Sequence, residues 1–285
     1  MTTNLKKYFQ TIFRWFREIF NTPKDNFVSS HQFELYSAAL ERPVLVEVLL
    51  PPGFSQAHPQ GYPLVLFNDG QDFEALQMKT TLEDLYQKGR LSRKLIVGIH
   101  AADRMQEYGT IQPKDYLNRG AKAKAYTEFI IDELLPHLYQ HFPCKRSAKD
   151  QSIAGFSLGG LSAFDIAWNH PEQFGQVGIF SGSLWWRSAD FNPNEPDADR
   201  IAHYLIEKGP IRQGMRFWLQ TGTKDETSDR NNNGIIDAID DTLDLIKALK
   251  ALGYSEKDIQ YLEVEGGEHN PQTWGKVMDQ FLCWI

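Results

Sequence analysis

The chain has 285 residues, 41% of them hydrophobic and 13% aromatic, which is enough for a sizeable core, and no segment is biased enough to indicate disorder. The formal net charge of −7 argues against nucleic acid or an anionic membrane as a main partner, because phosphate-binding surfaces need an excess of basic residues. The two cysteines, Cys144 and Cys283, are too few for a disulfide framework and lack metal-binding spacing, so we expect buried thiols.

The sequence predicts that residues 1–26 form a short extension that contains an amphipathic helix. Apolar residues recur at helical spacing between Leu5 and Phe20, while lysine and arginine residues interrupt any long apolar run. A secretory signal needs an uninterrupted apolar region and a small-residue cleavage site, so we expect a cytoplasmic protein, and no stretch is long enough to span a membrane. We interpret the helix as docked on the domain, with a membrane-surface or dimer contact as the alternative.

The sequence predicts that residues 27–285 form a single α/β domain, with a mostly parallel central sheet flanked by helices. Apolar patterns at 27–36 and 43–50 predict two strands that form an antiparallel opening. Continuous apolar runs at 62–67 and 93–99 are typical of strands buried on both faces of a parallel sheet. Strands and helices then alternate, which indicates a doubly wound sheet. Further strands are predicted before Ser157 and at 177–180, 216–220 and 259–264, and helices at 81–89, 121–142, after Ser157, 240–252 and from 273.

The segment Gly155-Phe156-Ser157-Leu158-Gly159 links one of these strands to the helix that follows it. A nucleophile on so sharp a turn has strained backbone angles, and the flanking glycines leave room for the strand and helix to pack closely. Ser157 is therefore our candidate nucleophile. The alternative is a glycine-rich turn that contains an ordinary serine.

Polar residues follow each predicted parallel strand, at the edge of the sheet where open α/β proteins bind ligands. In chain order, three of these strand ends supply Ser157, Asp225 and His269. This is the order of the α/β-hydrolase triad, in which an imidazole takes the serine proton and a carboxylate fixes its tautomer. Other residues at the strand ends are alternatives, namely His100 as the base and Glu226 or Asp229 as the acid.

The remaining parts of the predicted site surround this triad. We expect main-chain N–H donors for the oxyanion from Leu158 and from Gly70 or Gln71 in the loop after an earlier strand. The predicted substrate-pocket residues are Arg104, Trp185 and Trp186. As alternatives, Arg104 pairs with Glu107 and the tryptophans belong to the core. Because two adjacent aromatics cannot both face inward from regular structure, one of the two tryptophans should line the pocket.

From about Pro43 to its end, the chain resembles the putative-esterase family of α/β-hydrolases. Four segments carry the resemblance: Gly-Phe-Ser157-Leu-Gly-Gly, Phe-Ser-Gly-Ser-Leu-Trp-Trp186, Gly-Thr-Lys-Asp225-Glu and Gly-Gly-Glu-His269-Asn-Pro-Gln-Thr-Trp274. The family includes esterase D-like S-formylglutathione hydrolases, enterochelin esterases, feruloyl and acetyl-xylan esterases and mycolyltransferases. Asn68-Asp69-Gly70-Gln71 looks like the Asp-Gly-Gln segment of the enterochelin-esterase branch. The resemblance implies that Ser157, Asp225 and His269 form the triad, with main-chain donors at Leu158 and near Gly70.

The segment from Asp229 to Asp240 has the spacing of an EF-hand calcium loop, with oxygen-bearing side chains at positions 1, 3, 5, 9 and 12 and a glycine at position 6. The predicted ligands are Asp229, Asn231, Asn233, Asp237, Asp240 and the main-chain carbonyl of Ile235. Asp240 is shorter than the usual glutamate, which predicts weaker binding or help from Asp241. Our hypothesis is a structural calcium ion that orders the loop and positions Asp225. The alternative is a polar turn that caps the helix.

The sequence therefore predicts an esterase that acts on a small-molecule ester through an acyl-enzyme on Ser157, without an organic cofactor. Its oligomeric state stays open, with a homo-oligomer as one outcome. An acyltransferase of the same fold is the alternative among enzymes, and it would pass the acyl group to an acceptor other than water. A calcium-stabilised binding module without activity is the alternative from another class, and the intact serine, aspartate and histidine argue against it.

Overall fold

In the computed structural model, which describes residues 27–285, eight strands form one sheet in the order β1-β2-β4-β3-β5-β6-β7-β8. β1 pairs with β2 and β2 with β4 in antiparallel orientation, whereas every pair from β4 to β8 is parallel. The strands are β1 (Ser29–Ser37), β2 (Arg42–Leu50), β3 (Leu64–Asn68), β4 (Leu95–Ile99), β5 (Gln151–Phe156), β6 (Gln176–Phe180), β7 (Arg216–Lys224) and β8 (Ile259–Glu268). The predicted sheet with its antiparallel opening is confirmed, and the helix predicted within residues 1–26 lies outside the described residues.

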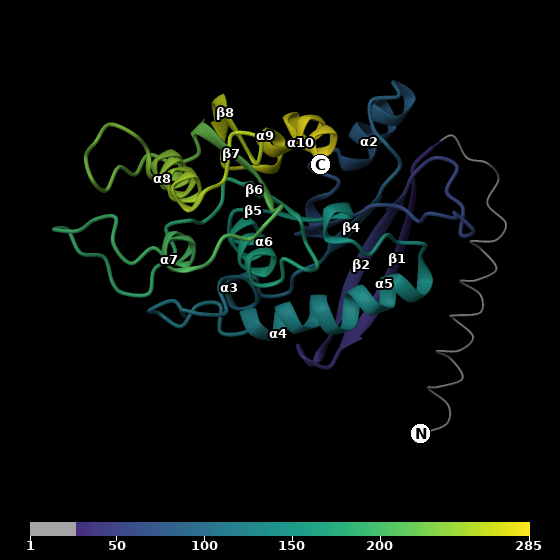
Figure 1. Ribbon diagram of the computed structural model, residues 1–285, viewed down its shortest axis with the longest axis horizontal. Coiled ribbons are helices and arrows are strands. Elements are labelled where there is room, and N and C mark those ends of the chain that lie inside the picture. Colours follow the sequence, from purple (N-terminus) through teal and green to yellow (C-terminus); the bar gives the residue numbers. More distant parts are fainter. Residues whose placement is uncertain (1–26) are drawn as a thin grey trace.

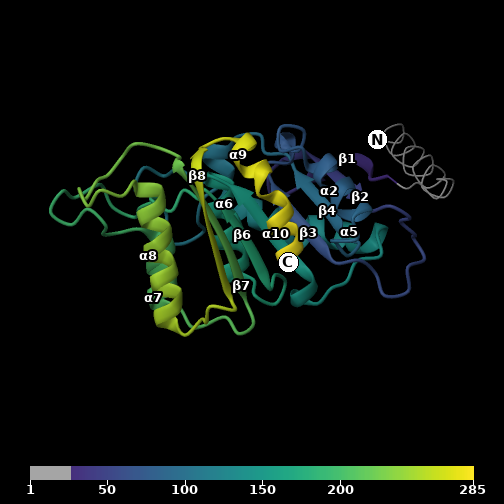
Figure 2. The same ribbon diagram turned by 90° about the horizontal axis from the view of Figure 1, so that it is seen from above.

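Helices cover both faces of this sheet (Figure 1). One face carries α2 (Met78–Gln87), α9 (Pro271–Lys276) and α10 (Met278–Trp284). The other carries α4 (Ala123–Glu128), α5 (Leu135–His141), α6 (Leu158–Asn169), α7 (Ile201–Lys208) and α8 (Asp237–Leu252). Figure 2 shows α7 and α8 packed together at the β7–β8 end of the sheet. A further single turn, α3 (Arg104–Glu107), follows β4.

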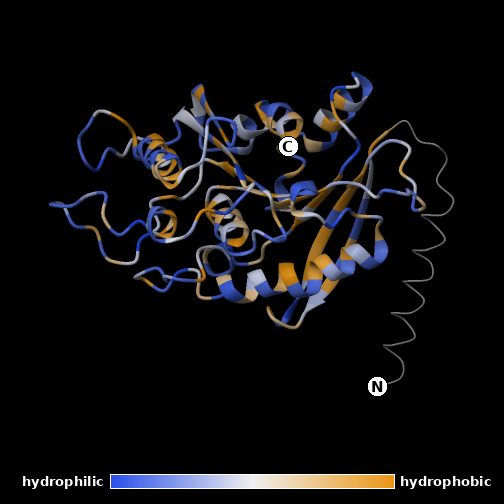
Figure 3. Ribbon diagram, viewed as in Figure 1, coloured by the Kyte–Doolittle hydropathy of each residue, from blue (hydrophilic) through white to orange (hydrophobic). Residues whose placement is uncertain are grey.

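The central strands supply side chains to two cores, one on each face of the sheet. In β3, Leu64 and Leu66 belong to the core under α4 to α8, whereas Val65 and Phe67 belong to the core under α2 and α10. Successive side chains of a strand point to opposite faces, so a strand covered on both sides must be apolar at every position. Figure 3 shows these strands as apolar, while the outer sides of the helices and the long loops are mostly hydrophilic.

The structure differs from the predicted helices at several boundaries. The helix expected at 121–142 consists of α4, a π-helical segment at Phe129–Leu134, and α5. The last helix is divided into α9 and α10, and α8 begins at Asp237 rather than at residue 240. α7 was not predicted, because eight residues are too few to stand out within a long polar connection. Within the part of the chain that the structure describes, the helices are too short or too polar to cross a membrane.

Candidate active site

Ser157 lies on the sharp turn between β5 and α6. Its backbone angles are φ 55° and ψ −121°, a conformation that side-chain-bearing residues rarely adopt. A Cβ atom on Gly155 would lie 2.2 Å from the carbonyl oxygen of Gly159, and one on Gly159 would lie 2.6 Å from the carboxylate of Asp69. Both glycines are therefore required by the close approach of strand, turn and helix.

The neighbouring strand β6 and the loop after it fix the serine through the main chain. The N–H of Ser157 donates to the carbonyl of Phe180 at 2.9 Å, and its own carbonyl accepts from the N–H of Ser183 at 3.1 Å. The hydroxyl oxygens Ser157 Oγ and Ser183 Oγ are 3.4 Å apart. Ser183 is thus a neighbour of the candidate nucleophile that the sequence did not single out, because a serine in a loop carries no distinctive signal.

Asp225 and His269 face each other directly after β7 and β8. His269 Nδ1 lies 3.7 Å from Asp225 Oδ1, and the aspartate side chain is fully buried. Asp225 Oδ2 accepts from the N–H of Gly222 at 3.0 Å, whereas Oδ1 has no hydrogen-bond partner within residues 27–285. The imidazole also packs edge-on against Trp274, with ring centroids 5.3 Å apart. A buried carboxylate oxygen that faces an imidazole can orient it and stabilise its cation, and such contacts are often long without substrate.

The surroundings of His269 favour its neutral form. Burial lowers the pKa of His269, the carboxylate of Asp225 raises it, and the cation of Arg104 lowers it, with a net downward direction. The imidazole is therefore uncharged at pH 7 and can accept a proton.

Two turns point main-chain N–H groups toward the same edge of the sheet. Leu158 is the first residue of α6, and Gly70 and Gln71 begin the 3-10 turn Gly70–Asp72 that follows β3. The first N–H groups of a helical segment have no acceptor within it, so both turns can supply donors to an oxyanion. A Cβ on Gly70 would lie 2.5 Å from the backbone of Gly98, which explains why this turn needs a glycine.

Arg104 is held beside the candidate nucleophile by Asp69. Arg104 Nε donates to Asp69 Oδ1 at 2.7 Å and Nη2 to Oδ2 at 3.0 Å, while Nη2 also lies 3.3 Å from the carbonyl oxygen of Phe156. Asp69 is fully buried with φ 63°, and it accepts further hydrogen bonds from Tyr108 Oη and Gln71 Nε2. The sequence did not assign Asp69, because neither its burial nor its positive φ can be derived from residue type.

The alternatives that the sequence left open take other partners. Glu107 does not pair with Arg104 but with Arg42, at 2.6 Å. The carboxylate of Asp229 accepts from the N–H groups of Asn233 and Gly234. His100 is bound to β2, because its main-chain N–H donates to the carbonyl of Leu45. Glu226 is bound to α8, because its carboxylate accepts from the N–H of Ala238.

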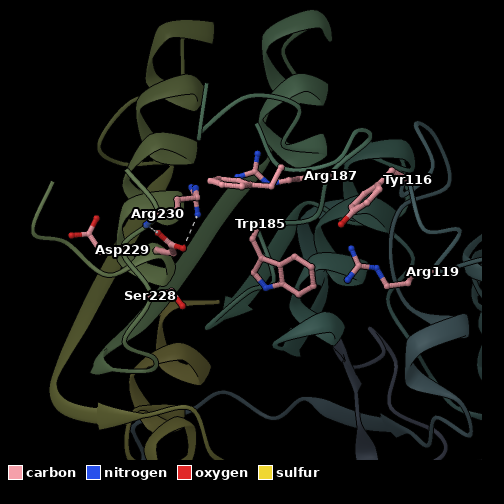
Figure 4. Close-up of a pocket in the computed structure, with 9 residues that line it drawn as sticks. Tyr116, Arg119, Trp185, Arg187, Ser228, Asp229 and Arg230 are labelled. Atoms are coloured by element: carbon pink, nitrogen blue, oxygen red, sulfur yellow. Dashed lines mark hydrogen bonds and ion pairs between the residues drawn. The ribbon is translucent and has the colours of Figure 1, made fainter. Parts of the chain in front are cut away.

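A cavity of about 580 Å³ is lined by residues from the loops that follow β6 and β7 (Figure 4). Trp185 lines it two residues after Ser183, and Ser228 lines it three residues after Asp225. The lining residues are Tyr116, Arg119, Trp185, Arg187, Phe191, Ser228, Asp229, Arg230 and Asp237. The prediction that Trp186 belongs to the pocket is wrong. Its side chain is fully buried, with the guanidinium of Arg119 4.7 Å from its ring centroid and Gly109 and Gly120 also packed against it.

The loop from Asp229 to Asp240 wraps around its own polar side chains. Asp240 Oδ2 accepts from the side-chain amides of Asn231 at 2.7 Å and Asn233 at 3.1 Å. Asp237 instead faces Arg230, whose N–H donates to it at 2.9 Å. The structure thus brings together four of the predicted ligands, Asp229, Asn231, Asn233 and Asp240. Within residues 27–285, no three His, Cys, Asp or Glu side chains are grouped to hold a metal ion, so this donor set depends on amide and carbonyl oxygens.

Comparisons with known proteins agree on one family. A family model described as Putative esterase matches residues 37–285. The chain is 24% identical over 240 residues to the uncharacterized protein YbbA of Bacillus subtilis. The aligned region covers 83% of this chain and 90% of the relative. A ferulic acid esterase structure superposes with a TM-score of 0.69 at 18% identity, over 90% of this chain and 97% of the other. An enterobactin esterase structure from Shigella flexneri gives 0.70 at 21% identity, over 90% of this chain and 58% of the other.

Proposed function

The chain belongs to the Putative esterase family and is an ester hydrolase, and we propose that it works as a serine esterase through an acyl-enzyme on Ser157. One observation carries the proposal. The strained turn presents Ser157 at the same edge of the sheet at which the buried carboxylate of Asp225 faces His269. This combination of nucleophile, base and orienting acid is what acyl transfer to a serine requires.

In the proposed reaction, His269 takes the proton of Ser157 as the Oγ atom attacks the ester carbonyl carbon. The carbonyl oxygen becomes an oxyanion, which the N–H groups of Leu158 and of the Gly70–Asp72 turn stabilise. The tetrahedral intermediate collapses, the bond to the alcohol oxygen breaks, and His269 returns the proton to that leaving group. Water then attacks the acyl-enzyme with His269 again as base, and the carboxylic acid leaves.

Arg104 supports this chemistry without taking part in proton transfer. Its guanidinium lies against the carbonyl of Phe156, the residue before the nucleophile, and Asp69 holds it there through two hydrogen bonds. Burial is the main cause that lowers the pKa of His269, and the charge of Arg104 adds to it, which favours the neutral base. We propose that it also contacts the substrate, since its side chain remains 39% exposed.

The proposal is tested by treating the protein with a fluorophosphonate and measuring its intact mass, alongside turnover of 4-nitrophenyl butyrate. We expect one adduct, on Ser157, and measurable turnover. A Ser157→Ala variant should lose both while its melting temperature changes little. An adduct on another residue, or retained turnover in this variant, would contradict the assignment. Transfer of the butyryl group to an added alcohol in preference to water would favour the acyltransferase alternative.

We further propose that a structural calcium ion binds the loop at Asp229–Asp240. The donor set fits calcium, because Asp229, Asn231, Asn233 and Asp240 supply hard oxygen ligands that the loop already brings together. When bound, the ion would order the segment that follows Asp225. It has no part in the proton transfers proposed for the triad.

A further inference from the structure

The three arginines that line the cavity differ in how their charges are balanced. Arg119 donates through Nε and Nη2 to the carboxylate of Asp115, at 2.8 and 2.7 Å. Arg230 pairs with three carboxylates, those of Asp197, Asp237 and Asp241. Arg187, in contrast, forms no salt bridge with any residue between 27 and 285. Its Nη1 and Nη2 donate to two main-chain carbonyls, those of Ala198 and Pro196.

Arg187 is also deeply placed, with 7% of its surface exposed. Burial lowers the pKa of Arg187, and the cations of Arg230 and Arg200 lower it too, while the carboxylates of Asp241 and Asp197 act against them. Its Nε–H makes no hydrogen bond within the described part of the chain. A buried cation without a paired anion raises the free energy of the folded state, and a bound anion would offset that cost.

Aromatic side chains in the lining of the cavity suit the uncharged body of a ligand. Figure 4 shows Trp185 between the side formed by Arg230 and Ser228 and the side formed by Tyr116 and Arg119. The indole of Trp185 is 36% exposed, and the guanidinium carbon of Arg119 lies 5.0 Å from its ring centroid. A volume of about 580 Å³ accommodates a small organic molecule. The cavity therefore offers the aromatic side chains of Tyr116, Trp185 and Phe191 for a ligand body and Arg187 for a charged end, while the carboxylates of Asp229 and Asp237 line another part of it.

We propose that Arg187 binds a carboxylate of the ester substrate, so that the enzyme prefers esters carrying a negative charge. A planar guanidinium with fixed donors is well matched to this group. The inference rests on the proposed function, since it assigns the cavity to the substrate of the triad. The carboxylate can belong to the acyl part or to the alcohol part of the ester.

The test compares two pairs of esters that differ in charge. The first pair carries the charge on the acyl part, 4-nitrophenyl hydrogen glutarate against 4-nitrophenyl valerate. The second carries it on the alcohol part, 3-acetoxybenzoate against its methyl ester. We expect kcat/KM for the charged member of at least one pair to be about tenfold to a hundredfold higher, as for a hydrogen bond to a charged group. Equal or lower values for both charged esters would overturn the proposal.

Variants then assign the preference to Arg187. Arg187→Met should bring the charged-to-neutral ratio of kcat/KM close to 1, and Arg187→Lys should restore part of it. Arg216→Met is the matched control, because Arg216 stacks on Trp284 at the start of β7 and should leave the ratio unchanged. If the preference persists in Arg187→Met, another group binds the carboxylate and the proposal is wrong.

A binding measurement separates this inference from the proposed mechanism. Titration of 3-acetoxybenzoate and of glutarate into the Ser157→Ala variant measures carboxylate binding without any turnover. We expect the Kd of at least one of the two carboxylates to be at least about tenfold below that of the matching amide. If both amides bind as tightly as the matching carboxylates, the inference is overturned. If the carboxylates bind but the wild type neither hydrolyses esters nor reacts with the fluorophosphonate, only the proposed mechanism fails. The titration also decides the matter if Arg187→Met does not fold.

Discussion

The two halves of the proposed triad are held in different ways. The nucleophile half, β5 with α6, is buried at every residue of the strand, and its turn is fixed by backbone-to-backbone contacts at Gly155 and Gly159. The acid–base half consists of the residues that follow β7 and β8 at the edge of the sheet. β8 is partly exposed along its length, and the side chain of His269 is 39% exposed. Main-chain packing therefore sets the nucleophile, whereas loop position sets the base.

This difference has a functional consequence. A serine keeps a strained backbone conformation only when several surrounding contacts hold it there, and the buried nucleophile half provides such contacts. The pair formed by His269 and Asp225, with 3.7 Å between Nδ1 and Oδ1, has a distance still to close before it forms a hydrogen bond. We expect substrate binding to tighten the acid–base half and to leave the nucleophile half unchanged.

The largest effect on rate should come from Asp225→Asn. The amide oxygen can still accept from the N–H of Gly222, but the amide no longer favours the tautomer that His269 needs, so kcat should fall about 10⁴-fold. The melting temperature should be unchanged or higher, because a buried charge has been removed. Steady-state kinetics and thermal unfolding check both. A large drop in melting temperature would show that this half is as tightly packed as the other.

The converse prediction is Gly155→Ala, which should act on stability first. The new Cβ would meet the backbone of Gly159 at 2.2 Å, and backbone cannot move aside as a side chain does, so we expect a loss of about 3 kcal/mol in the free energy of unfolding. Gly89→Ala is the control, because Gly89 has positive φ but open space around its Cβ position, and it should cost roughly 1 kcal/mol. Equal losses in the two variants would refute the packing argument.

The same difference explains which features the sequence predicted. The turn at Ser157 is set by local chemistry, so the pattern of glycines around one serine was enough to place it. Asp225 and His269 could be proposed from their order along the chain, because each follows a strand of a parallel sheet. Asp69, Ser183 and Arg187 matter only through residues far away in the sequence, and no local pattern marks an aspartate that binds Arg104 or an arginine without a carboxylate. Trp186 was misassigned for the same reason, since Arg119, Gly109 and Gly120 from an earlier part of the chain pack against it.

The third prediction uses pH to probe the acid–base half. Because the pKa of His269 is lowered, kcat/KM should rise with pH through a midpoint below the ordinary value near 6.5, as the imidazole loses its proton. Arg104→Gln removes the neighbouring cation and should move this midpoint to higher pH, so that activity at pH 6 falls more than activity at pH 8. A midpoint that stays in place would mean that Arg104 does not act on the base.

The smallest expected effect concerns the proposed calcium ion, which would add order next to Asp225 in the less constrained half. A ligand that binds only the folded state at about a hundred times its Kd stabilises it by about 2.7 kcal/mol, so adding calcium to chelator-treated protein should raise the melting temperature by about 5 °C. Asn231→Ala should abolish this response, whereas Asn194→Ala, in an exposed loop, should retain it. If neither chelator nor calcium changes the melting temperature or the esterase rate, the metal is ruled out. The hydrogen bonds around Asp240 would then be what orders the loop. A response confined to the melting temperature would show that calcium stabilises the loop without positioning Asp225, because a better-placed carboxylate must also change kcat.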